Sequence, residues 1–194
     1  MQTTIIWTGT RYHSIEHCVL TKTVVGNEIT STIIGSSENQ IYKVGYHINT
    51  NENWEMTFVT LRTLVDNSDE SFTLEKKDGK WLLNGKLNFD LQNIFDIDIS
   101  LTPFTNTLPI NRLQLKDNER KVIEVLYFDI LEKQIRPVKQ IYTRLAADRY
   151  IYENYDKSFK AEIKIDEQGL VVEYPELFEM TVKNESNLEK KIFD

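Results

Sequence analysis

Polar and apolar residues alternate along most of this chain, and a period of two is typical of β-strands. The alternating runs are rich in Val, Ile, Thr, Tyr and Phe, and short polar turns separate them. Hairpins are expected around Gly26-Asn27, Asp78-Gly79, Asn84-Gly85 and the turn at 166–169. Together these runs predict about fifteen short strands, joined mostly by hairpins.

One segment departs from the alternation and predicts a short helix. Thr is a good N-cap and Pro is favoured at the first helical position, so Thr102-Pro103 indicates where the helix begins. Pro109 is expected to end the helix within about two turns. Phe104 and Leu108 stand four apart and are expected on its buried side.

The sequence also indicates that part of the sheet is covered on both faces. Residues 122–128 (Val-Ile-Glu-Val-Leu-Tyr-Phe) are apolar on both sides of the expected strand. A strand with one wet face would alternate more strictly. Either a second sheet layer or the helix at Thr102-Pro103 therefore lies against it.

Length and composition favour one soluble globular domain over residues 1–194, with no linker between domains. The chain has 40% hydrophobic and 27% charged residues, which is ordinary for such a protein. The charged tail 183–194 is expected to fray or to form a terminal helical turn. The net charge of -7 argues against a nucleic-acid partner and against docking on an anionic membrane surface.

The location expected from the sequence is the cytoplasm. One cysteine excludes an intrachain disulfide framework and suits a reducing compartment. The N-terminal residues have neither the basic segment nor the apolar segment of a signal peptide. No window approaches the roughly 18 apolar residues of a membrane span, so an integral membrane protein is not expected.

Asp96 and Asp98 are the most suggestive pair of acids. They lie on one face of an expected strand, about 6.5 to 7 Å apart, with Phe95 and Ile97 on the other face. The pair could share a cation, act as acid and base, or bind sugar hydroxyls. Alternatively, Arg112 holds one carboxylate through its planar fork and locks the bend. We expect both acids to share one local environment.

Short polar residues follow where the chain is expected to be buried. Thr105 and Asn106 either satisfy backbone groups at the helix ends or contact a polar head group. The candidate ligand-binding residues are Asp96, Asp98, Thr105, Asn106 and Arg112.

Other chemistry is weakly supported. His13 and His17 stand four apart, a spacing that converges on a helix but not on the strand expected here, so no metal site is predicted. The lone Cys18 is expected to be a small buried residue. No nucleophile elbow, phosphate loop or dinucleotide fingerprint occurs, and neither a catalytic motif nor a cofactor is predicted. A minority of the aromatic residues are expected to line a groove suited to sugars or acyl chains.

Several motifs together resemble a known family. The strongest is Asp96-Ile97-Asp98 through Thr102-Pro103-Phe104-Thr105-Asn106-Thr107-Leu108-Pro109-Ile110 to Arg112-Leu113. Weaker matches are Trp7, Glu16-His17-Cys18, Tyr46, Trp54, Asp78-Gly79-Lys80-Trp81, Gln140, Tyr142-Thr143, Asp166, Gly169-Leu170-Val171 and Tyr174-Pro175. On these residues, spread over nearly the whole chain, the sequence resembles the bacterial family of putative glycolipid-binding proteins. It departs from them at Asn111, at Phe95 and at Glu55-Met56, which weakens any strongly anion-binding version of the site.

The resemblance implies an all-β fold, in which a long antiparallel sheet of about fifteen strands curls around a single short α-helix. This spiral β-roll is similar to the fold of the lipoprotein-localisation carriers. The resemblance also implies a homodimer, and non-enzymatic binding of an amphipathic ligand, a glycolipid, in the concavity of the sheet. The alternatives are a structural or interaction protein with a filled core, and a carbohydrate or ester hydrolase using Asp96 and Asp98.

Overall fold

The computed structural model describes residues 1–88, 91 and 94–187 as fifteen strands and one helix. The first eight strands are β1 Gln2–Gly9, β2 Ser14–Lys22, β3 Asn27–Ser37, β4 Gln40–Thr50, β5 Met56–Val65, β6 Ser68–Lys77, β7 Lys80–Leu83 and β8 Lys86–Leu87. After them come β9 Asp96–Ile99, α1 Phe104–Leu113, β10 Arg120–Asp129, β11 Gln134–Ala146, β12 Arg149–Asn154, β13 Lys160–Ile165, β14 Val171–Tyr174 and β15 Phe178–Ser186. The prediction of about fifteen strands and one short helix is confirmed.

All fifteen strands form one sheet in the order β8-β7-β6-β5-β4-β3-β2-β1-β15-β14-β13-β12-β11-β10-β9. Most neighbours in the chain pair as antiparallel hairpins, whereas β8 and β9 lie at the two edges of the sheet. The pairing of β1 with β15 joins the two halves of the sheet. One pair among the described strands, β9 with β10, is parallel, so the sheet is mixed rather than wholly antiparallel. The chain can make this parallel pair because the long connection through α1 separates its two strands.

The four predicted hairpins are present. Asp78-Gly79 and Asn84-Gly85 supply two-residue turns with positive φ at each residue. The connection between β2 and β3 is longer than expected, because the strands end at Lys22 and restart at Asn27. The tail also differs from expectation: residues 183–186 belong to β15 and pair with β1 rather than fraying. Residues 188–194 of the predicted tail lie outside the described residues.

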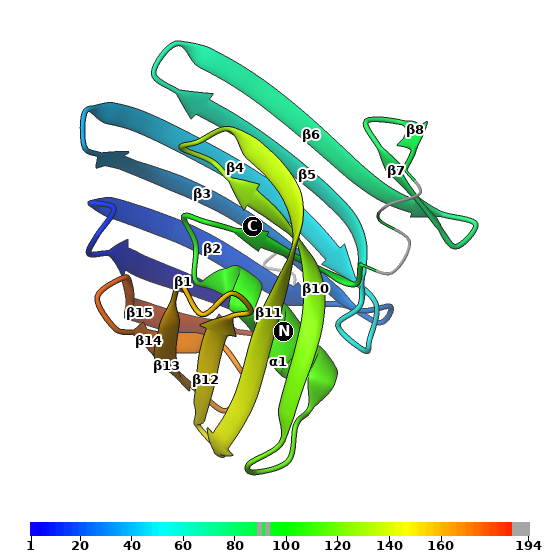
Figure 1. The fold of residues 1–194 in the computed structure, drawn as a ribbon, viewed down its shortest axis with the longest axis vertical. Helices are drawn as coiled ribbons and strands as arrows, with labels where there is room; N and C mark the ends of the chain where they lie inside the picture. Colours follow the sequence, from blue (N-terminus) through cyan, green and yellow to red (C-terminus); the bar gives the residue numbers. More distant parts are fainter. Residues whose placement is uncertain (89–90, 92–93, 188–194) are drawn as a thin grey trace, which may run out of the picture.

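The sheet curls around α1, as Figure 1 shows, with the helix between the strands β1–β4 and the strands β10–β12. Alternation along β3 is regular, so Ile29 and Ile33 are buried on the inner face while Glu28 and Thr30 are exposed outside. This regular alternation gives the sheet an apolar inner face and a polar outer one.

The helix begins close to the predicted position but continues further. Thr102 accepts a hydrogen bond from the backbone N–H of Phe104, and Phe104 and Leu108 are fully buried, as predicted. The prediction that Pro109 ends the helix is wrong, since α1 runs through it to Leu113. Proline removes one intrahelical bond, but tertiary packing of the following turn, in which Ile110 is buried, outweighs that loss.

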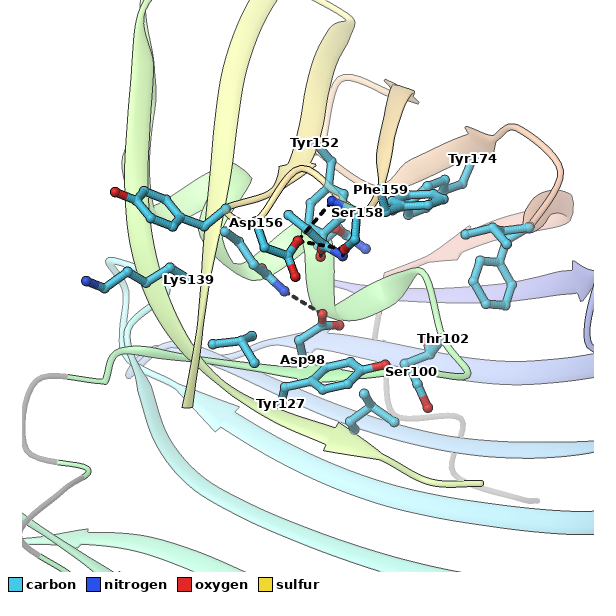
Figure 2. A pocket seen from close by; sticks show the side chains of 18 of the residues that line it. Asp98, Ser100, Thr102, Tyr127, Lys139, Tyr152, Asp156, Ser158, Phe159 and Tyr174 are labelled. Carbon is cyan, nitrogen blue, oxygen red and sulfur yellow. Dashed lines mark hydrogen bonds between the residues drawn. The ribbon is translucent and has the colours of Figure 1, made fainter. Parts of the chain in front are cut away.

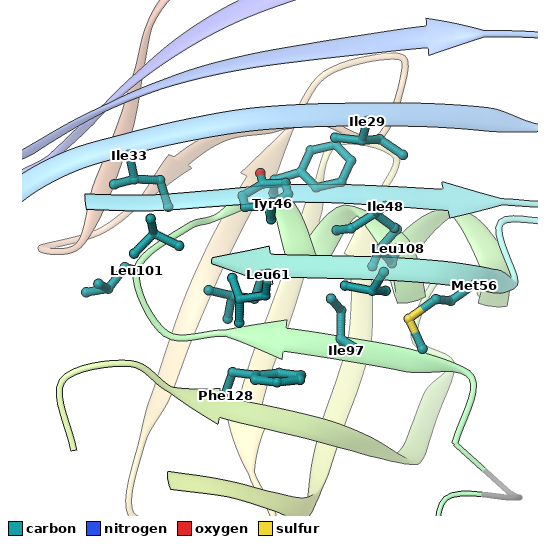
Figure 3. Packing of buried hydrophobic residues seen from close by; sticks show 14 of the residues in the cluster. Ile29, Ile33, Tyr46, Ile48, Met56, Leu61, Ile97, Leu101, Leu108 and Phe128 are labelled. Atoms are coloured by element: carbon teal, nitrogen blue, oxygen red, sulfur yellow. The ribbon is translucent and has the colours of Figure 1, made fainter. Parts of the chain in front are cut away.

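Apolar side chains fill the space between the helix and the sheet. The larger cluster takes residues from β1 to β7, β9, β10 and α1. Figure 3 shows Ile48, Leu61, Ile97 and Leu108, which belong to it. A smaller cluster lies at the other end of the helix and includes Ile110, Val125, Tyr142 and Ile163. The concavity that the sequence assigned to a ligand is therefore largely packed with the protein's own side chains.

No helix within the described residues is long and apolar enough to cross a membrane.

Candidate functional site

Asp96 and Arg112 form an ion pair where the start of β9 meets the end of α1. Arg112 donates from Nε to both carboxylate oxygens, at 3.1 and 3.2 Å, and its Nη2 also reaches Oδ2. The Asp96 side chain is fully buried and that of Arg112 is 17% exposed. Burial raises the pKa of Asp96, and the hydrogen bonds and charge of Arg112 oppose that rise. The predicted bond between Arg112 and one of the two acids is confirmed.

The other face of this strand differs from expectation. Phe95 was expected on the apolar side, but its side chain is 39% exposed and the Arg112 guanidinium lies 5.4 Å from its ring centre. The guanidinium that holds Asp96 therefore also makes a cation–π contact with this exposed ring.

Asp98 has a different environment from Asp96. Its carboxylate accepts hydrogen bonds from Gln140 Nε2 at 2.6 Å and from Thr105 Oγ1 at 3.0 Å. Burial raises the pKa of Asp98, and the two hydrogen bonds oppose the rise. The expectation that both acids share one environment is wrong, because α1 runs back along β9. Its last turn therefore faces Asp96 and its first turn faces Asp98.

Thr105 and Asn106 both have protein partners. Besides its bond to Asp98, the Thr105 hydroxyl accepts from the backbone N–H of Ile99 at 3.3 Å. Asn106 Oδ1 accepts from the Tyr142 hydroxyl at 2.9 Å, and its amide donates to the carbonyl of Pro103 at 3.4 Å. Thr105 thus joins helix and strand, while Asn106 joins the helix to β11.

A cavity of about 560 Å³ opens beside Asp98. Figure 2 shows Asp98 and Tyr127 on one side of it, with Asp156, Ser158 and Phe159 on the other. Seven of the lining side chains are aromatic: Tyr12, Tyr127, Tyr152, Tyr155, Phe159, Tyr174 and Phe178. Of the five predicted site residues, Asp98 and Asn106 line the cavity, whereas Asp96, Thr105 and Arg112 do not.

The aromatic rings form a connected wall. Tyr152 packs on Phe159 and Tyr174 with ring centres 6.1 and 6.2 Å apart, and Tyr174 packs on Phe178 at 6.2 Å. Tyr12 stacks on Phe178 at 5.7 Å, although the two residues are far apart in the sequence. Sequence analysis predicted groove-lining aromatics without identifying them, because the pairing of distant strands decides which rings meet.

Basic side chains, which sequence analysis missed, lie at the same cavity. Arg11, Arg136 and Lys139 are exposed and belong to its lining. The guanidinium of Arg136 lies 5.6 Å from the Tyr127 ring centre, and the Lys139 ammonium lies 5.6 Å from that of Tyr155. No sequence signal marked these three residues, since they come from the β1–β2 turn and from β11.

A buried polar cluster lies next to the cavity, which it touches through Thr102. Glu16 Oε1 accepts from Ser31 Oγ at 2.7 Å and from the Tyr46 hydroxyl at 2.6 Å. Its Oε2 atom is buried and has no hydrogen-bond partner within the described part of the chain. Burial raises the pKa of Glu16 to about 7, while hydrogen bonds with Thr102, Tyr46 and Ser31 lower it.

The region from His13 to Cys18 does not converge on a metal. Along β2 the side chains of Glu16 and Cys18 point inward and that of His17 points outward, while His13 lies in the preceding turn. No three His, Cys, Asp or Glu side chains in the described ranges gather closely enough to hold a metal ion. Cys18 is fully buried, as expected for a small core residue.

Comparison with known proteins places this architecture in a family. The model of the family described as "Putative glycolipid-binding" matches residues 4–180. The chain belongs to this family. The resemblance inferred from the central Asp96–Leu113 block is thereby confirmed.

One solved structure agrees with this assignment. A crystal structure of a DUF1089 family protein from Pseudomonas aeruginosa is 32% identical, covers 84% of this chain and 91% of its own, and has a TM-score of 0.75. A protein of the DUF1849 domain of unknown function from Brucella abortus is 10% identical over 94% of this chain and 96% of its own, with a TM-score of 0.48. None of the curated proteins compared with the chain matches it.

Proposed function

We propose that this protein binds an amphipathic molecule of the glycolipid class without transforming it, and that the polar head group lies in the cavity beside Asp98. One observation carries the proposal: a cavity of about 560 Å³ lined by seven aromatic side chains together with Asp98, Asn106 and Gln140. Its volume falls within the range of about 300 to 1,000 Å³ typical of small-molecule sites. The family description supports the same class of ligand.

The lining suits a sugar. Aromatic faces pack against the C–H surfaces of a pyranose, and polar groups between them bind its hydroxyls. An ionised carboxylate has about four acceptor positions. Asp98 uses two of them for Gln140 and Thr105, so two are left for hydroxyl donors of a ligand.

The structure suggests different roles for the five predicted residues. Asp98 and Asn106 reach the cavity and are proposed to contact the head group. Thr105 holds Asp98, and the buried Asp96–Arg112 pair fixes β9 to the helix, so these three residues are proposed to position the site. The alkyl part would lie against Val138 and Leu177, the partly buried aliphatic side chains of the lining, because the space around the helix is filled.

The hydrolase alternative is less well supported. It needs Asp96 and Asp98 to face one substrate, whereas Arg112 binds Asp96 and only Asp98 lines the cavity. A glycosidase needs both carboxyl groups beside the same scissile bond, and an acid outside the cavity cannot take part in this arrangement.

Binding of alkyl glucosides of increasing chain length, measured by calorimetry, tests the proposal. Affinity should rise with each added methylene by up to about 0.8 kcal/mol and then level off when the apolar lining is covered. A Tyr152→Leu variant should bind about tenfold more weakly or worse, because it removes a ring and a hydroxyl from the wall.

Phe72→Leu is the matched control, since Phe72 packs on Phe128 in the larger cluster and does not line the cavity. It should leave the affinity unchanged. Absence of binding by the wild-type protein across the whole series would favour the structural or interaction-protein alternative instead.

A further inference from the structure

Asp98 is a partly buried carboxylate that forms no ion pair with a basic side chain in the described part of the chain. Its hydrogen-bond partners in the described chain, Gln140 and Thr105, are both neutral. Asp96, two residues earlier, is bound by the Arg112 guanidinium. Buried charges in proteins are normally paired, because removing an ion from water is costly. The cavity wall therefore carries a negative charge that the protein itself does not balance by a direct contact.

Tyrosine side chains line the same cavity as this carboxylate: Tyr127, Tyr152 and Tyr174 belong to its lining together with Asp98, as Figure 2 shows. Burial raises the pKa values of these three tyrosines, and the charge of Asp98 raises them further. The faces of aromatic rings attract cations, and rings grouped around a carboxylate are typical of sites for organic ammonium ions.

We propose that the head group of the ligand carries a positively charged nitrogen, which lies beside Asp98 among the tyrosine rings. This inference rests on the proposed function and names the chemistry of the head group. Two sources supply such a nitrogen: an amino sugar and a choline-type head group.

The charges at the opening refine the inference. Three basic residues belong to the lining of the same cavity: Arg11, Arg136 and Lys139. None of them forms an ion pair with an acidic side chain of the described chain. Asp156, which also lines it, accepts two hydrogen bonds from Ser158. An anionic group next to the ligand nitrogen would pair with these basic residues, so a zwitterionic head group matches the acidic and basic side chains of the lining.

Four amphiphiles with one common alkyl chain test this inference by calorimetry. Their head groups are neutral glucoside, 2-amino-2-deoxyglucoside, phosphocholine and phosphate. At least one of the two nitrogen-bearing compounds, the amino sugar or the phosphocholine, should bind at least about tenfold more tightly than the neutral glucoside. The phosphate compound should bind no more tightly than the neutral glucoside. The tighter of the two nitrogen-bearing compounds identifies the source.

An Asp98→Asn variant should lose the preference for the charged nitrogen while keeping its affinity for the neutral glucoside within a few-fold. Asp69→Asn is the control, because Asp69 is an exposed acid that pairs with Arg62 outside the cavity. The melting temperature of each variant checks folding, and the wild-type ranking decides the question even if Asp98→Asn fails to fold.

The outcomes separate the two proposals. Equal affinity for the neutral and nitrogen-bearing compounds would overturn the ammonium inference and leave glycolipid binding intact. Tightest binding of the phosphate compound would also overturn it, since the basic opening alone would then decide affinity. Failure of all four compounds to bind would overturn the proposed function itself.

Discussion

At the scale of single residues, hydrogen-bond and ion-pair partners distinguish three acids that look alike in the sequence. Asp96 is fully buried against Arg112, and Asp98 is bound by neutral groups. Glu16 lies in the core, and one of its oxygens has no hydrogen-bond partner among the described residues. Burial raises the pKa of all three, and what differs is the partner that opposes the rise. These differences lead to separate expectations for stability.

Removing Arg112 should be strongly destabilising. Arg112→Met keeps the apolar stem but leaves Asp96 buried without its partner, which typically costs about 3 to 5 kcal/mol of unfolding free energy. Arg62→Met removes an ion pair whose side chains are 74% and 48% exposed, and should cost far less than Arg112→Met, because water screens the two charges. Urea unfolding measures the unfolding free energy of both variants. An equal loss in Arg112→Met and Arg62→Met would contradict the stabilising role of the buried pair.

Glu16 should make stability depend on pH. Its pKa is about 7 in the folded protein, against an ordinary value of 4.5. Between these pH values the folded state binds more protons than the unfolded state, so the free energy of unfolding falls as pH rises and levels off above about pH 7. A shift of this size corresponds to about 3 kcal/mol.

Glu16→Gln should flatten this decline, because the neutral amide mimics the protonated acid. Glu75→Gln replaces an exposed acid on β6 and should leave the decline as it is in the wild-type protein. Unfolding curves over the range from about pH 4.5 to about pH 7 compare the three proteins. An unchanged slope in Glu16→Gln would show that another group is responsible.

At the scale of elements, the helix is held in the curl by contacts that follow Pro109. Asn111 donates from Nδ2 to the carbonyl of Thr107 within the helix and to the carbonyl of Gln168 in the β13–β14 turn, both at 3.1 Å. Together with Arg112, it gives the last turn of α1 fixed partners on two sides. This explains why the helix continues to Leu113 although a proline lies inside it.

The contact between Asn111 and the turn predicts a glycine effect. Gly169 has φ +73°, and a Cβ atom there would lie 2.5 Å from Asn111 Nδ2. Gly79 has φ +75° with open space around it, so Gly79→Ala shows the cost of backbone strain alone. Gly169→Ala should therefore lower the unfolding free energy by more than Gly79→Ala.

The combined variant Gly169→Ala/Asn111→Ala should recover part of the excess loss, since it removes the clashing side chain. Thermal unfolding of the single and combined variants measures the coupling between the two positions. Strict additivity of the two single effects would contradict a steric contact.

At the scale of the whole molecule, the sheet places an apolar inner face around the helix but leaves aliphatic side chains on its outer face. Ile15, Ile34, Ile41 and Leu64 are 60%, 59%, 69% and 42% exposed and lie on the neighbouring strands β2 to β5. Exposed apolar patches often mark interaction surfaces. The homodimer implied by the family resemblance stays a prediction, as do the single domain and the cytoplasmic location.

The sequence alone determined the elements and part of the site. Alternation and turn residues such as Asp78-Gly79 act over a few positions, so the hairpins could be predicted from neighbouring residues. The pairing of Arg112 with an acid could be predicted because the planar guanidinium fork matches a carboxylate and both acids lie close to it in the sequence. The central block of residues also indicated the family correctly.

Only the tertiary structure decided which groups share the cavity. Tyr12 stacks on Phe178, and Gln140 binds Asp98, across separations that depend on the order and curl of fifteen strands. The direction in which α1 returns along β9 assigned Arg112 to Asp96 and left Asp98 to the cavity. Local sequence patterns do not show which of these distant residues meet, because such contacts arise only when the whole sheet packs on the helix.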